Sequence, residues 1–269
     1  MTAAQFYDSH VHLADARFAG RSAAVLAEFQ AAGGCGLLAV AARCSDWEAV
    51  SQLAGLSGVW GALGVHPLYR EGWDPGQGPQ QLGTALAANP ALRAVGEIGL
   101  DFQYGRDDQR EQEELFRCQL AVAAAAGYPV AFHNRRSWRE FFAILRELGQ
   151  TVRGVCHNFT GSREVAREIL DWGLFISFGG PLTYPNAWRA QEAACYVPSD
   201  RLLVETDAPD LPPWPRRAAG STPADVVRVL GELARLRGSE VPELAARVAG
   251  NFADLFLSPR ERQEMPRSA

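Results

Sequence analysis

Apolar positions along this chain recur with two different periods, and the two kinds of segment alternate. Short apolar runs rich in valine, leucine, phenylalanine and alanine predict strands. Longer segments with apolar residues at helical spacing separate them, for example at 22–32, 109–126, 138–148 and 162–171. Several helices are expected to end at a glycine, namely Gly33, Gly127, Gly149 and Gly173. The strands are predicted near 5–12, 36–41, 58–65, 93–98, 128–133, 153–157, 173–178 and 201–206.

The strand-then-helix order predicts a parallel α/β sheet closed into a TIM (β/α)8 barrel, with about 34 residues for each unit. A doubly wound open sheet is the alternative, but no Gly-x-Gly-x-x-Gly turn follows the first strand. We expect one barrel domain over 1–269, because the proline-rich segment 208–215 directly follows the last strand and resembles a rim loop. The tail from about 258 is polar and expected to be frayed.

The amino-acid composition limits which classes of protein this chain can belong to. Hydrophobic residues make up 47% and charged residues 21% of the chain, as in a globular protein with a sizeable core. No secretory signal or membrane-spanning run is visible, and the five cysteines include no Cys-x-x-Cys pair, so we expect reduced thiols and a cytoplasmic location. A net charge of -5 indicates no general basic surface for nucleic acid. A monomer is the default expectation.

Polar residues with metal-binding chemistry gather at the carboxyl ends of the predicted strands. His10 and His12 are two residues apart, so on a strand both side chains point the same way. Barrel enzymes build their active sites at these strand ends, and imidazole and carboxylate groups bind divalent transition metals. All five histidines lie at such ends, together with two acidic residues: His10, His12, His66, Glu97, His133, His157 and Asp207.

The spacing of these residues predicts a two-metal centre. His10, His12 and Asp207 come from the first and last strands, which are neighbours in a closed barrel. His133 and His157 come from adjacent strands and can hold a second ion. All 26 basic residues are arginines, so no carbamylated lysine can bridge the ions, and Glu97 is the natural bridge. Two such ions polarise a phosphoryl oxygen and activate a water molecule.

With these motifs in order along almost its whole length, the chain resembles the TatD-related DNases, metal-dependent hydrolases of the amidohydrolase-like barrel class. The resemblance rests on segments 8–13, 64–67, 96–102, 132–135, 155–161, 205–209 and 251–256. It implies the same six metal ligands, with His66 contacting the substrate phosphate and Asp207 acting as the base. The chain departs from the family pattern at Asn134, Asn158 and the segment 221–223.

Two interpretations remain open for other residues near the site. His66 could instead only cap its proline turn. Glu205 shares a strand face with Asp207, so it could support the metal centre or pair with an arginine in the barrel core. The rim carries aromatic and arginine side chains that would suit stacked bases and phosphates, with Arg135 and Tyr104 as the substrate contacts, or that could simply be solvated. The rim residues are Phe102, Tyr104, Arg106, Arg135, Arg136, Trp214, Arg216 and Arg217.

The function predicted from the sequence is a phosphodiesterase, a 3′-5′ exonuclease on single-stranded DNA, with Glu97 and Asp207 as catalytic residues and Mg, Mn or Zn as the ions. An amide or ester hydrolase, such as a deacylase of misacylated tRNA, would use the same ligands. Histidinol-phosphatase-like barrels would require a further histidine after His157, and none is present. A barrel with a purely structural metal would need fewer ligands and no open coordination position.

Overall fold

The computed structural model describes residues 5–149, 152–216 and 220–264, and within them eight parallel strands form one sheet in sequential order. An isolated bridge between Val11 and Ala208 joins the first strand to the chain after the eighth, so the sheet closes on itself. The expected barrel is confirmed. The strands are β1 Phe6–Val11, β2 Gly34–Val40, β3 Val59–Leu63, β4 Leu92–Asp101, β5 Val130–Arg135, β6 Gly154–Cys156, β7 Phe175–Phe178 and β8 Leu202–Val204.

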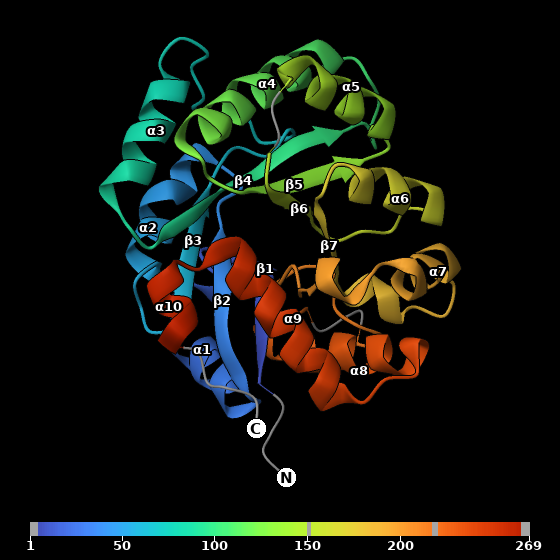
Figure 1. Ribbon diagram of the computed structural model, residues 1–269. Helices are drawn as coiled ribbons and strands as arrows, with labels where there is room; N and C mark the ends of the chain where they lie inside the picture. Colours follow the sequence, from blue (N-terminus) through green and yellow to red (C-terminus); the bar gives the residue numbers. More distant parts are fainter. Residues whose placement is uncertain (1–4, 150–151, 217–219, 265–269) are drawn as a thin grey trace.

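Helices follow the strands and surround the barrel (Figure 1). They are α1 Ser22–Ala31, α2 Trp47–Leu53, α3 Gly78–Ala88, α4 Gln109–Ala126, α5 Trp138–Leu148, α6 Arg163–Asp171, α7 Trp188–Tyr196 and α8 Val226–Arg237. Short 3-10 turns are η1 Ala16–Phe18, η2 Cys44–Asp46, η3 Gly180–Thr183, η4 Ser199–Arg201 and η5 Pro223–Asp225. No helix in the described ranges is long and apolar enough to span a membrane.

The core lies between the strands and the helices, where aromatic rings interlock. Phe116 of α4 stacks on Phe141 of α5 with ring centroids 5.6 Å apart, and Phe132 of β5 meets Phe141 edge-on at 5.2 Å. All three side chains are fully buried. Burial of each contributes about 1.5–3 kcal/mol, so this packing fixes α4 and α5 against β5, the strand that carries His133.

Two further helices, α9 Val241–Phe256 and α10 Pro259–Glu264, cover the amino-terminal ends of the strands. Phe252 of α9 stacks on Tyr7 at 4.8 Å and lies 5.7 Å from Trp60. Asn251 donates hydrogen bonds of 2.7 Å to the carbonyls of Ser199 and Leu202. Tyr7, Trp60 and Leu202 stand at the beginnings of strands, so α9, which crosses in front of β1 and β2 in Figure 1, closes the end opposite to the candidate ligands.

The described part of the tail is ordered, unlike the frayed segment expected from about 258. Glu261 of α10 accepts hydrogen bonds from the Trp60 indole at 2.9 Å and from Arg93 at 2.8 Å. These partners lie at the beginnings of β3 and β4. The Glu261 side chain therefore holds the polar helix α10 against the barrel. Residues 265–269 lie outside the described ranges.

Candidate metal centre

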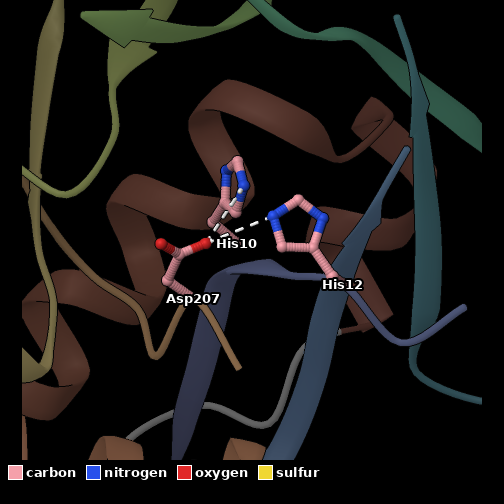
Figure 2. Close-up of side chains that lie close together, drawn as sticks. All are labelled: His10, His12 and Asp207. Atoms are coloured by element: carbon pink, nitrogen blue, oxygen red, sulfur yellow. Dashed lines mark ion pairs between the residues drawn. The ribbon is translucent and has the colours of Figure 1, made fainter. Parts of the chain in front are cut away.

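Strand β1 and the chain after β8 bring three predicted ligands together. Asp8, fully buried, accepts hydrogen bonds from the backbone N–H groups of His10 and Thr206, both at 3.1 Å, and from the Thr206 hydroxyl at 2.5 Å. These bonds join the two segments. Asp207 Oδ1 lies 3.3 Å from His12 Nε2 and 3.7 Å from His10 Nε2, and Figure 2 shows the three side chains pointing toward one another.

A second group of ligands lies on the other side of Glu97. His133 Nδ1 and His157 Nε2 are 3.2 Å apart. Glu97 Oε2 is 3.3 Å from the first nitrogen and 3.1 Å from the second, while Glu97 Oε1 is 3.4 Å from His12 Nε2. One carboxylate oxygen therefore faces His12, while the other faces His133 and His157 and also lies 3.9 Å from His10 Nε2. A carboxylate between two groups of imidazoles is the arrangement expected of a bridging ligand.

The chemistry of this donor set fits metal ions. His10 is fully buried, yet neither of its ring nitrogens has a hydrogen-bond partner within the described chain. An unpaired buried polar atom is costly, and a lone pair directed at a cation removes that cost. The His10 ring stacks on His157 at 3.9 Å, which holds it in place without a hydrogen bond. His10, His12 and Asp207 form one candidate metal-binding group.

Charges in the centre favour the ionised form of Glu97. Burial alone would raise the pKa of Glu97, but the imidazoles of His66, His133 and His157 hold it well below its usual range. Burial also lowers the pKa of His12, but Asp207 and Glu97 outweigh it and raise that pKa to about 9. For His10, burial and the neighbouring His157 lower the pKa well below its usual value, so its imidazole is neutral.

Two carboxylates outside the ligand set orient the imidazoles. Asp101 Oδ2 is 3.1 Å from His133 Nε2, and Glu205 Oε1 is 3.2 Å from His157 Nδ1. The carbonyl of Val40 plays the same part for His12 Nδ1 at 3.1 Å. Such partners fix which ring nitrogen would face a metal ion.

Of the two interpretations of Glu205, the structure supports the one that places it behind the metal centre, because its partner is His157 rather than an arginine. The contact of Asp101 with His133 was not predicted from the sequence. It had a detectable signal, because Asp101 lies an even number of positions after Glu97 on the same strand and so projects from the same face.

His66 lies beside this centre, with its ring 4.2 Å from that of His133. Its Nδ1 accepts a 3.0 Å hydrogen bond from the backbone N–H of Leu68. Burial and the neighbouring His133 lower the pKa of His66 to about 3, so the ring is neutral and its proton is on Nε2. One nitrogen thus caps the proline turn, and the other remains available as a donor.

The motifs and this geometry agree with a comparison against known families. The family model for TatD related DNase matches residues 7–257. The chain belongs to the TatD-related DNase family. A solved structure of YjjV, a TatD homologue from Escherichia coli K12, superposes with a TM-score of 0.89 at 31% identity, covering 96% of this chain and all of that one.

Relatives of this TatD-related chain are named as metal-dependent hydrolases and as nucleases. The 3′-5′ ssDNA/RNA exonuclease TatD of Klebsiella pneumoniae is 35% identical over 257 residues, which cover 93% of this chain and 97% of that protein. The uncharacterized metal-dependent hydrolase YabD of Bacillus subtilis is 36% identical over 199 residues, 74% and 77% of the two chains. The chain is therefore a metal-dependent hydrolase that acts on ester bonds.

Solvent-exposed aromatic rings of this TatD-related chain concentrate on the face that carries the ligands. In the described ranges they are Tyr104, 82% exposed, Trp188, 62%, Trp214, 48%, and Tyr69, 38%. They follow β4, β7, β8 and β3 respectively, or begin the next helix. These four rings therefore lie around the rim that surrounds the candidate metal centre.

The arginines predicted for the rim differ in their partners. Arg106 lies over Phe102 at 4.5 Å but also forms a 2.8 Å ion pair with Glu140. Arg216 pairs with Asp225 at 3.0 Å. Arg135 and Arg136 are exposed and form no ion pair with any described residue. Arg217 lies outside the described ranges.

Proposed function

We propose that this chain is a 3′-5′ exonuclease that hydrolyses single-stranded DNA with two divalent metal ions. The observation that carries the proposal is the position of Glu97, with one oxygen facing His12 and the other facing His133 and His157. The Klebsiella pneumoniae relative, named a 3′-5′ ssDNA/RNA exonuclease, supports the same activity.

Six side chains would hold the two ions: His10, His12, Glu97, His133, His157 and Asp207. When bound, such ions polarise a phosphoryl oxygen and lower the pKa of a water molecule. Asp207 takes the proton of the attacking water, because its side chain is 12% exposed and reaches the open side, whereas that of Glu97 is 4% exposed. His66 donates its Nε2–H to a phosphate oxygen, where negative charge gathers during the reaction.

The rim supports a polynucleotide substrate. The exposed rings of Tyr104, Trp188 and Trp214 offer stacking surfaces to unpaired bases, which duplex DNA does not present. Arg135, exposed and without an ion pair in the described chain, can contact a phosphate. Because the net charge is -5, the protein has no general basic surface, and phosphate contacts depend on individual arginines such as Arg135.

Hydrolysis of a single-stranded DNA oligonucleotide labelled at its 5′ end tests the proposal. With added Mg²⁺ or Mn²⁺, the wild type should produce a ladder that shortens from the 3′ end, and a 3′-terminal phosphorothioate should stop it. Glu97→Ala and Asp207→Ala should each lower kcat at least about a hundredfold. Glu192→Gln, an exposed change on α7, is the matched control.

Wild-type rates in either alanine variant would overturn the mechanism. Fewer than two bound ions per chain at saturating metal would exclude the two-metal arrangement. If the wild type leaves DNA intact but cleaves the ester of misacylated tRNA, the same ligands serve the alternative deacylase.

A further inference from the structure

A series of side chains leads from the metal centre to the rim beside β2. The ring of His66 lies 4.2 Å from His133, and the ring of Tyr69 lies 5.0 Å from His66. Next comes Arg43, whose guanidinium carbon is 4.1 Å from the centre of the Tyr69 ring. The series thus joins a candidate metal ligand to a cation at the protein surface.

The loops that carry these residues are held together by the backbone. The N–H of His66, which follows β3, donates to the carbonyl of Ala42, which follows β2, at 2.9 Å. The N–H of Tyr69 donates to the carbonyl of His66 at 2.9 Å. Arg43 therefore sits on a wall that is fixed with respect to the metal centre.

Arg43 has no acidic partner in the described parts of the chain. The nearest acid in sequence is Asp46, whose Oδ2 accepts the backbone N–H groups of Ala42 and Arg43 at 3.1 and 3.0 Å. No carboxylate of the described residues forms an ion pair with the Arg43 guanidinium, and the side chain is exposed. Arg106, which also stacks on a ring, differs because Glu140 neutralises it.

We propose that Arg43 binds the phosphodiester next to the one being hydrolysed, with Tyr69 holding its guanidinium plane in place. This inference rests on the proposed nuclease function and specifies its substrate as a chain with at least two phosphates. A stacked guanidinium keeps its N–H edges free for bidentate contact with phosphate oxygens. Because stacking already restricts the side chain, little rotamer freedom is lost on binding.

Two substrates separate this subsite from the metal centre. A single-stranded oligonucleotide carries many phosphates, and bis(4-nitrophenyl) phosphate carries one. Arg43→Ala should raise KM for the oligonucleotide, and this fold increase should be about ten times the fold change in KM for the small ester. The kcat for the oligonucleotide should change less than about twofold. The slope of log KM against log salt should fall by about 0.7, the value for one phosphate contact on a single strand.

The control variant is Arg247→Ala, an exposed arginine on α9 at the opposite end of the barrel. It removes the same charge and should leave both KM values unchanged. Tyr69→Phe should keep the oligonucleotide KM, whereas Tyr69→Ala should raise it. The proposal would be overturned if Arg43→Ala raised KM by the same factor for both substrates. It would also be overturned if Arg43→Ala and Arg247→Ala had the same KM for the oligonucleotide.

Binding without turnover keeps this test independent of the nuclease proposal. Fluorescence anisotropy of a labelled oligonucleotide with EDTA present should show about tenfold weaker binding by Arg43→Ala than by the wild type. If the wild type hydrolyses neither substrate but this difference remains, the nuclease proposal fails and the phosphate subsite stands. If anisotropy shows no difference, the subsite is excluded whatever the hydrolysis rates are.

Discussion

The histidines of the centre differ in which ring nitrogen faces Glu97. His133 presents Nδ1 to Glu97 because Asp101 engages its Nε2, whereas His157 presents Nε2 because Glu205 engages its Nδ1. His10 has no such partner and is held by stacking on His157. For His133 and His157, the ring nitrogen that faces Glu97 is therefore set by the carboxylate on the other side of the ring.

Asp101→Asn tests this orientation. The amide can still accept the backbone N–H of Gln103, which the carboxylate accepts at 2.8 Å, so the fold should persist. It loses the charge that holds His133, and metal affinity should fall about 10- to 100-fold. Calorimetric titration with the metal ion measures this change in affinity, with Glu192→Gln as the control. Unchanged affinity would show that Asp101 does not support the ligand.

A glycine, Gly99, lies in the part of strand β4 that extends beyond the predicted end of the strand. The sequence predicted a strand ending near 98, but β4 continues to Asp101. Gly99 pairs with His133 and has a φ of 152°, and a Cβ there would lie 1.8 Å from the His133 carbonyl oxygen. Only glycine permits this approach. The close pairing of β4 with β5 brings Asp101 next to His133.

Helix α10 depends on one ionised carboxylate. Burial alone would raise the pKa of Glu261, but hydrogen bonds from Ser258 and Trp60 and the charge of Arg93 lower it from 4.5 to about 2. The ionised form is thus favoured by folding. Its stabilising effect is complete above the ordinary pKa and is lost as the pH falls from about 4.5 toward 2.

Glu261→Gln should lower the free energy of unfolding by about 1 kcal/mol at pH 7, since the pair is partly solvated. The difference from wild type should shrink between pH 4.5 and 3. Urea unfolding at pH 7, 4 and 3 measures it, and Glu192→Gln should show no such dependence. A difference independent of pH would mean that the charge is not what docks the helix.

At the scale of the whole molecule, the two ends of the barrel have separate tasks. The carboxyl ends of the strands carry the candidate ligands and the exposed aromatic rim, while α9 and α10 cover the amino-terminal ends. Phe252 is fully buried against Tyr7 and Trp60 and contacts no candidate ligand among the described ring pairs. Stability and chemistry should therefore respond to different substitutions.

Phe252→Ala should cost about 3–5 kcal/mol of unfolding free energy because it leaves a cavity under α9. Metal content and hydrolysis per folded molecule should stay at wild-type values below the lowered melting temperature. Denaturant unfolding and elemental analysis of the same preparation give both quantities. A stable variant with lost metal would contradict the separation of the two ends.

The sequence by itself determined the barrel and the position of the candidate ligands. Strand periodicity is local, so the directions of His10 and His12 follow from their spacing, and strand order predicts which ends are neighbours. Because the chain contains no lysine, the sequence also predicts a carboxylate, Glu97, as the bridging residue.

Tertiary structure decided which side chains pair. Glu205 contacts His157, Arg106 is neutralised by Glu140, and Glu261 docks the tail, whereas Arg43 remains without an acidic partner in the described chain. These outcomes depend on distances between loops and helices far apart in the sequence. Local patterns carry no information about such distances, because each loop conformation is set by the packing of the whole barrel.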